Sequence, residues 1–173
     1  MESSEALRAI DAAKAMAVAL DLAVDDATLL RNSNKLALRL LPCDVFARVG
    51  PAGLGLARFE FELARGLAAA GSPVTALEPR VDPRAYESDG FGASLWTHYE
   101  TVTPRVAPRD CASALASLHA GMRTIDVPAP HFTDRVADPT ANIASAAALN
   151  DADRDFLSAR LRDLGRAVID RGP

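Results

Sequence analysis

The sequence predicts an α+β protein, with an antiparallel sheet in its first part and helices in its second. Short apolar runs with β-type alternation fill residues 25–99, whereas apolar residues recur at helical spacing from residue 104 onward. Such segregation of strands and helices is typical of α+β folds. The 173 residues are 49% hydrophobic, enough for one domain with a core or for two small lobes. We expect two lobes, 1–100 and 101–173, joined near residues 99–104.

The first lobe is predicted to begin with an alanine-rich packing helix, capped by Ser3 or Ser4 and ending near Leu20. Its apolar face would contain Leu7, Ile10, Ala13 and Ala17. A three-stranded meander follows, with strands at 27–30, 36–41 and 44–49 and a polar turn at 31–34. The remaining elements are a helix over about 54–70, a short strand over 74–77, a hairpin turn at Asp89-Gly90 and a strand over 91–99.

The second lobe is predicted to be helical. Helices are expected at 112–122, at 132–149 with Pro139 as a weak point, and at 151–170. The last of these has the clearest pattern, with Asn150 or Asp151 as its cap and Gly172-Pro173 after its end. One face of it is apolar and consists of Phe156, Leu157, Leu161, Leu164 and Val168.

One strand and the helix after it each place a charge among apolar residues. In the strand 44–49, Arg48 lies on the face opposite to small apolar side chains. In the helix, Glu60 lies on the apolar stripe, whereas Glu62 follows Arg58 by four residues on a solvated face. Leaving one member of a buried pair alone costs about 3–5 kcal/mol, so we expect Arg48 and Glu60 to pair. The alternative is that Arg48 extends to solvent from an edge strand.

Composition and charge exclude several classes of protein. The net charge of −4 and the pI near 5.3 argue against a nucleic-acid-binding protein, which would have a basic face. Only Lys14 and Lys35 are lysines, so arginines are the expected functional cations. Cys43 and Cys111 lack the spacing of a zinc site or a disulfide framework. No apolar run approaches the ~20 residues that span a membrane and the N-terminus is acidic, so we expect a cytoplasmic protein.

The order of these features resembles the aminoglycoside/choline phosphotransferase family, which has the protein-kinase-like fold. The segments that carry the resemblance are the turn Asn32-Ser33-Asn34, the strand with Arg48, the helix with Glu60, the turn Gly71-Ser72-Pro73-Val74, the strand 91–99 and the run 115–120. It covers the chain from about residue 25 to its end. The resemblance implies a kinase-like N-terminal lobe, made of an antiparallel sheet plus a helix, followed by a partial helical C-terminal lobe.

The resemblance also implies a nucleotide partner, ATP, bound by the first lobe. Arg48 stands where the family has the Lys or Arg that contacts the α- and β-phosphates, and Glu60 stands at the helix carboxylate that fixes this cation. Ser33 and Asn34 stand at the loop that covers the phosphates, although the glycines usual in such loops are missing here.

The strand 91–99 would lead into the segment that meets the base. The resemblance implies that backbone groups around Thr97 and Tyr99 lie at the adenine edge. Trp96 would either wall this pocket or simply belong to the core.

The chemistry of the family comes from a later loop with a His-Gly-Asp motif, a downstream Asn and a further Asp that binds Mg²⁺. None of these motifs occurs here, and His119 lies in a helical pattern followed by Ala120-Gly121, so we assign no catalytic residue and no Mg²⁺ ligand. We therefore expect the N-terminal portion of an ATP-dependent small-molecule phosphotransferase that is not catalytically competent alone. Its last helices would lack part of their covering lobe, which favours a homo-oligomer.

Two other interpretations stay open at this point. The chain could be a short protein without catalysis that binds a nucleotide or another ligand, or that dimerises. It could also be an unrelated α+β binding domain, in which Arg48 and Glu60 form an ion pair with a structural role only.

Overall fold

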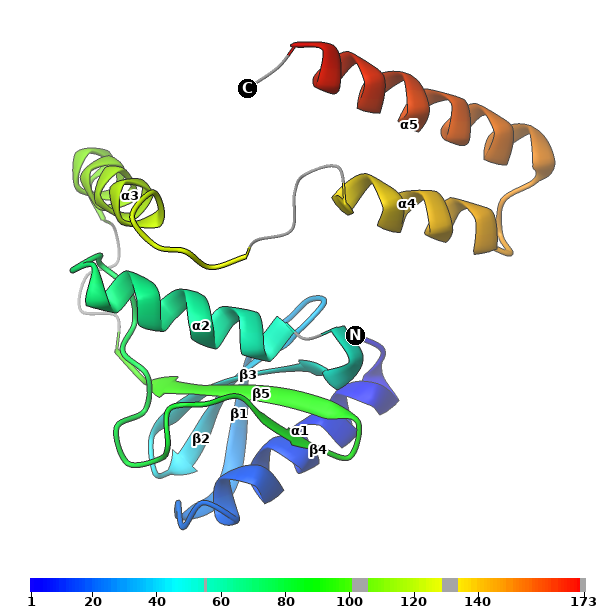
Figure 1. The fold of residues 1–173 in the computed structure, drawn as a ribbon. Helices are drawn as coiled ribbons and strands as arrows, with labels where there is room; N and C mark the ends of the chain where they lie inside the picture. Colours follow the sequence, from blue (N-terminus) through cyan, green and yellow to red (C-terminus); the bar gives the residue numbers. More distant parts are fainter. Residues whose placement is uncertain (55, 101–105, 129–133, 172–173) are drawn as a thin grey trace. The chain divides into compact units, whose positions relative to one another are not determined.

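A five-stranded antiparallel sheet forms the centre of the first of two units, Met1–Val127 and Pro128–Pro173 (Figure 1). The computed structural model describes residues 1–54, 56–100, 106–128 and 134–171. Its mixed helix and antiparallel-sheet content confirms the α+β class. The predicted lobe boundary near 99–104 falls largely outside the described residues, and the division into 1–100 and 101–173 stays a prediction.

The predicted meander is confirmed, and it supplies three adjacent strands of the sheet. In spatial order the strands are β1 (Val24–Asn32), β2 (Leu36–Pro42), β3 (Val45–Pro51), β5 (Phe91–Thr97) and β4 (Tyr86–Ser88). The hairpin turn between β4 and β5 is also confirmed. Asp89 and Gly90 both have positive φ, 52° and 80°, as a two-residue type I′ turn requires. Because β3 lies between β2 and β5, Arg48 is on a central strand, and the edge-strand alternative is wrong.

The predicted strand over 74–77 is not formed. Leu77 makes only an isolated antiparallel bridge to Trp96. The Glu78 amide donates to the Leu95 carbonyl and the Thr97 amide donates to the Ala76 carbonyl, at 3.1 and 2.9 Å. Pairing along β5 is therefore confined to residues 76–78, because the amide of Val74 bonds locally to Ser72.

Helix α1 (Ser3–Val18) covers one face of the sheet (Figure 1). Its buried face consists of Ala6, Ala9, Ala12, Ala13, Met16 and Ala17, which pack on the inward residues of β2, β3 and β5. Leu7 is 65% exposed, so its predicted place on the buried face is wrong. Alanines let the helix lie close to the sheet, and the face is centred on them rather than on the larger leucine. The predicted serine cap is also wrong, since Glu2 is the N-cap residue and makes no side-chain cap bond.

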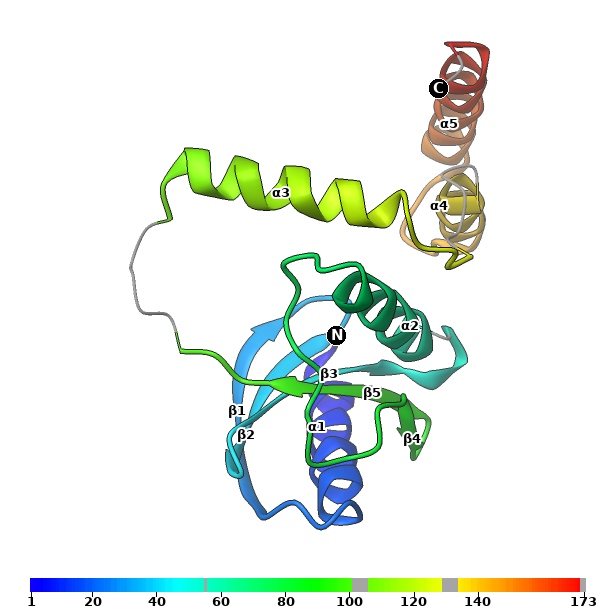
Figure 2. The same cartoon turned by 60° about the vertical axis from the view of Figure 1, so that its left-hand side comes forward.

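Helix α2 (Leu56–Ala69) lies on the opposite face, over β3 and β5, after the short 3₁₀ turn η1 (Ala52–Leu54) (Figure 2). Helix α3 (Pro108–Met122) packs near the end of α2. A Cβ on Gly121 would lie 1.8 Å from the Ser72 hydroxyl oxygen, so only glycine permits this approach as the structure has it. On this face α2 contacts β3 and β5, and the candidate site lies beside these three elements.

The second unit contains helices α4 (Asp134–Ser145) and α5 (Asp151–Arg171). The predicted cap is confirmed, because the Asp153 amide donates to Asn150 Oδ1 at 2.9 Å. The Arg154 guanidinium donates to the carbonyls of Ile143, Ala144, Ala146 and Leu149, and thereby fixes the connection between the two helices. The apolar face of α5 is largely exposed. Within the described ranges, each helix is too short or too polar to cross a lipid bilayer.

Candidate functional site

The predicted ion pair between β3 and α2 is formed. Arg48 Nη2 lies 2.9 Å from Glu60 Oε1. The burial is less complete than the sequence suggests, because the Arg48 side chain is 41% exposed and that of Glu60 is 22% exposed. The reason is a cavity beside the pair, which keeps the guanidinium in reach of solvent.

Lys35 is a third member of this cluster that the sequence interpretation missed. Its Nζ lies 2.9 Å from the same Glu60 oxygen, and its side chain is only 9% exposed. A Cβ on Gly50 would lie 3.0 Å from Lys35 Cγ, so the glycine leaves room for the aliphatic stem. A signal was available: a lysine is rare in this chain, and Lys35 directly precedes the apolar run of β2.

Strand β5 completes the cluster from the other side. The register places Ser94 opposite Arg48 and Trp96 opposite Phe46. The Trp96 indole N–H donates to Ser94 Oγ at 2.9 Å, and Ser94 Oγ lies 3.5 Å from Glu60 Oε2. Trp96 is buried and also lines the cavity, so it is both core and pocket wall.

The cavity beside the ion pair has a volume of about 400 Å³. It is lined by β3, α2, β5, α3 and the segment after α2, through residues that include Phe46, Arg48, Glu60, Leu67, Trp96 and Leu118. Its walls are mainly apolar, and the two charges lie together. This is the pattern of a small-molecule site, in which a few polar groups orient a ligand.

A second cavity, of about 550 Å³, lies at the end of β5. Thr97, His98, Tyr99 and Glu100 line it, together with Leu30, Arg39, Phe46 and Thr75. The structure thus brings Thr97 and Tyr99 to a cavity, and their place at an adenine edge stays a prediction. Phe46 and Thr75 line both cavities, so the two are neighbours on one face of the sheet. The Thr97 amide already donates to Ala76 and is not available to a ligand.

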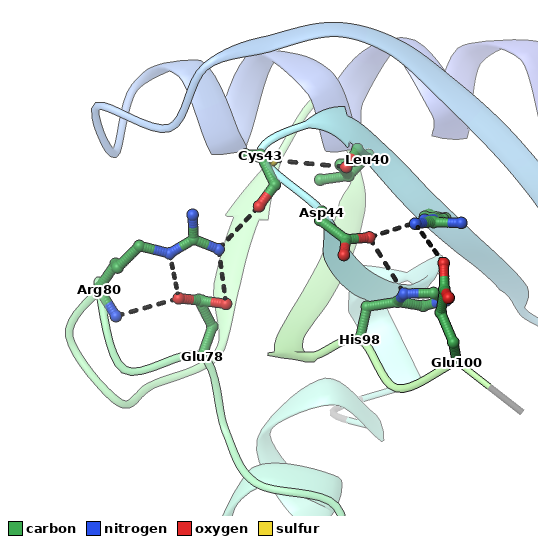
Figure 3. Close-up of polar contacts among 8 residues, drawn as sticks. Leu40, Cys43, Asp44, Glu78, Arg80, His98 and Glu100 are labelled. Atoms are coloured by element: carbon green, nitrogen blue, oxygen red, sulfur yellow. Dashed lines mark hydrogen bonds and ion pairs between the residues drawn. The ribbon is translucent and has the colours of Figure 1, made fainter. Parts of the chain in front are cut away.

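A network of charges holds the rim of the second cavity (Figure 3). Arg39 Nε lies 2.7 Å from Asp44 Oδ1, and Arg39 Nη2 lies 3.3 Å from Glu100 Oε1. His98 Nδ1 lies 3.0 Å from the same Asp44 oxygen. The hydrogen bond from Arg39 lowers the pKa of Asp44, which therefore stays ionised as an anchor. Asp44 has a positive φ of 57° in the β2–β3 turn, and its carboxylate faces the His98 ring (Figure 3).

A second pair ties the segment before β4 to the same turn. Arg80 Nε and Nη2 donate to the two carboxylate oxygens of Glu78 at 2.5 and 3.0 Å, and Nη2 also donates to the Cys43 carbonyl at 2.9 Å (Figure 3). Glu78 is 3% exposed. The hydrogen bond from the Arg80 side chain lowers the pKa of Glu78 below its ordinary value. This pair supports the structure and lines neither of the two cavities among their described residues.

The turn that contains Ser33 and Asn34 is formed, but neither residue is among the described lining residues of the two cavities. Ser33 N and Oγ both contact the Lys35 carbonyl, at 3.1 and 3.2 Å. Without glycines the turn closes on itself through these bonds. In the part of the chain that the structure describes, no cluster of three His, Cys, Asp or Glu side chains could hold a metal ion, and Cys43 and Cys111 are free thiols.

The contacts of the site and the sequence pattern are the basis for the function proposed below. No protein-family model, no curated protein and no solved structure matches this chain.

Proposed function

We propose that the unit Met1–Val127 binds ATP, as the N-terminal lobe of a small-molecule phosphotransferase of the aminoglycoside/choline type with a kinase-like fold. The phosphates would lie beside Arg48, and the base would lie in the neighbouring cavity at Thr97 and Tyr99. The observation that carries the proposal is the 2.9 Å pair between Arg48 on β3 and Glu60 on the next helix, at the mouth of a cavity.

This pair supports the proposal because protein kinases use the same arrangement. There, a lysine on the third strand pairs with a glutamate of the following helix and contacts the nucleotide phosphates. Arginine meets both needs, since phosphate binding requires fixed positive charge and several donors. Arg48 Nε is buried and has no hydrogen-bond partner among the described residues, so the guanidinium is not saturated by protein contacts.

The cavities support a ligand with two different parts. Volumes of about 400 and 550 Å³ each fall in the range of roughly 300–1,000 Å³ that small-molecule sites occupy. One contains Arg48 beside apolar walls, which suits a phosphate next to a sugar. The other is lined by residues 98 and 99, and Phe46, which lines both cavities, can stack on a base.

We propose binding without phosphoryl transfer by this chain alone. Transfer depends on a residue that orients the acceptor and on carboxylates that hold Mg²⁺. The described residues contain no group of three or more His, Cys, Asp or Glu side chains that could hold a metal ion, and the sequence contains no His-Gly-Asp motif.

The test is ATP binding by the wild-type chain and by Arg48→Met, measured by calorimetry and by thermal shift. We expect Arg48→Met to raise the Kd at least about tenfold, since a charge-assisted contact to phosphate is lost. Incubation with ATP and Mg²⁺ should release no more phosphate than buffer does.

The matched control is Arg58→Met. Arg58 is an exposed arginine at the start of α2 that pairs with Glu62 at 2.9 Å, and its loss changes the net charge of the chain equally. It should leave the Kd unchanged. An equal loss in both variants, or no ATP binding by the wild type, would reject the nucleotide site and favour a structural ion pair.

A further inference from the structure

Two cations share one carboxylate oxygen in the candidate site. Lys35 Nζ and Arg48 Nη2 each lie 2.9 Å from Glu60 Oε1. One negative charge cannot neutralise two positive charges, so the triad carries a formal charge of +1. Ser94, which contacts the other Glu60 oxygen, is neutral and does not alter this sum.

The two cations differ in where they face. Arg48 and Glu60 line the 400 Å³ cavity, whereas Lys35 is not among its described lining residues. Lys35 lines a closed crevice in which there is no space for a water molecule; Arg48 and Glu60 border both this crevice and the cavity, whereas Lys35 borders the crevice alone. Its 9% exposure against 41% for Arg48 agrees with this division. Glu60 therefore contacts a buried cation, Lys35, and an accessible cation, Arg48, which lines the cavity.

We propose that Lys35 is a positioning residue. It neutralises Glu60 from the side away from the cavity, so that the positive charge of Arg48 is not offset and is available to a phosphate-bearing ligand. The inference rests on the proposed function, since it concerns an anion bound at Arg48. The ligand class it specifies is a polyphosphate, recognised by a surplus cation rather than by a balanced ion pair. Lys35 itself makes no contact with the ligand.

The proposal predicts that ligand affinity follows the formal charge of the triad. In Lys35→Met the triad becomes Glu60 with Arg48, and its formal charge falls from +1 to 0. In Lys35→Met/Glu60→Gln, Arg48 stands alone and the charge returns to +1. A residue with only a structural role would give a double variant at least as impaired as the single one.

The experiment measures Kd for ATP and for inorganic tripolyphosphate by calorimetry in low salt, with the fold of each variant checked by circular dichroism. We expect Lys35→Met to raise both Kd values about tenfold or more, because a nearby unit charge is removed. The double variant should return to within about fivefold of wild type. Lys14→Met is the control, since Lys14 lies on α1, on the other face of the sheet from α2, and donates to the Asp25 carbonyl; it should have no effect.

The outcomes separate the two proposals. If the wild type binds neither probe, the nucleotide site and the role of Lys35 are both rejected. If the wild type binds and Arg48→Met loses binding, but Lys35→Met binds normally, only the role of Lys35 is rejected. If Glu60→Gln alone binds like the wild type, a double variant that binds no better than Lys35→Met also rejects it.

Discussion

At the scale of single residues, two carboxylate–arginine pairs differ in how deeply the carboxylate is buried. Glu78 is 3% exposed and receives two guanidinium bonds from Arg80. Glu62 pairs with Arg58 on the solvated side of α2. A charge removed from water depends on its partner, whereas an exposed pair gains little. We therefore expect only the Glu78 pair to matter for stability.

Arg80→Met should lower the free energy of unfolding by about 1–2 kcal/mol at pH 7, because Glu78 would stay buried without its cation. The sign with pH follows from the lowered pKa of Glu78. A carboxylate with a depressed folded pKa stabilises the protein above its unfolded value, about 4.3, and this contribution is lost as the pH falls through the folded pKa. The difference between wild type and variant should therefore shrink in acid.

Urea unfolding from pH 7 down to pH 3 measures this difference. Arg58→Met serves as the reference for an exposed arginine and should change stability little at any pH. A difference that is independent of pH would show that Arg80 acts through its packing alone.

The sequence could predict part of the site at this scale and not the rest. Arg48 and Glu60 were evident because each interrupts an apolar pattern, and elements adjacent in sequence bring them together. Lys35 lies between a polar turn and a strand, where a charge breaks no pattern. That Lys35 contacts Glu60 becomes evident only from the pairing of β2 with β3, which places Lys35 across from Gly50. Glu78 and Asp44 lie in turns, where charged residues are ordinary.

At the scale of elements, the β4–β5 hairpin is the clearest case of local sequence setting local structure. Asp89-Gly90 adopts positive φ at both positions, and the turn fixes the register of β4 on β5, with Ser88 opposite Phe91 and Tyr86 opposite Ala93. The sheet strands were predictable for the same reason, since alternation and turn residues are local signals. The 74–77 strand was not, because only residues 76–78 of this segment pair with the backbone of β5.

Gly90→Ala should destabilise the first unit by about 1–2 kcal/mol, because an L-residue with a side chain is strained at a φ of 80°. Gly53→Ala is the matched control: a Cβ there meets nothing within 4 Å, and its φ is not in the positive range. Thermal melts of both variants test this. Equal melting temperatures for the two would contradict the assigned turn.

At the scale of the whole molecule, the exposed apolar residues of α5 are the main feature that the proposed nucleotide site does not use. Phe156, Leu164 and Val168 are all exposed on this helix. Patches of this kind favour association with another apolar surface. A homo-oligomer therefore stays our prediction for this chain.

Sedimentation should show a mass that rises with concentration, and Leu164→Glu should reduce this rise. Leu7→Glu is the control, because Leu7 is equally exposed but lies on α1, in the first unit. A mass of one chain at every concentration would reject the prediction. An equal effect of both variants would indicate nonspecific association.

The shared carboxylate of Glu60 also has a dynamic consequence. Helix α2 is tethered to β2 through Lys35 and to β3 through Arg48, so it cannot swing away from the sheet without separating two ion pairs at once. The surface that we propose to bind an anion is thus held by two ion pairs in the absence of a ligand. A ligand would meet a rigid receptor, and little of its binding free energy would be spent on ordering the protein.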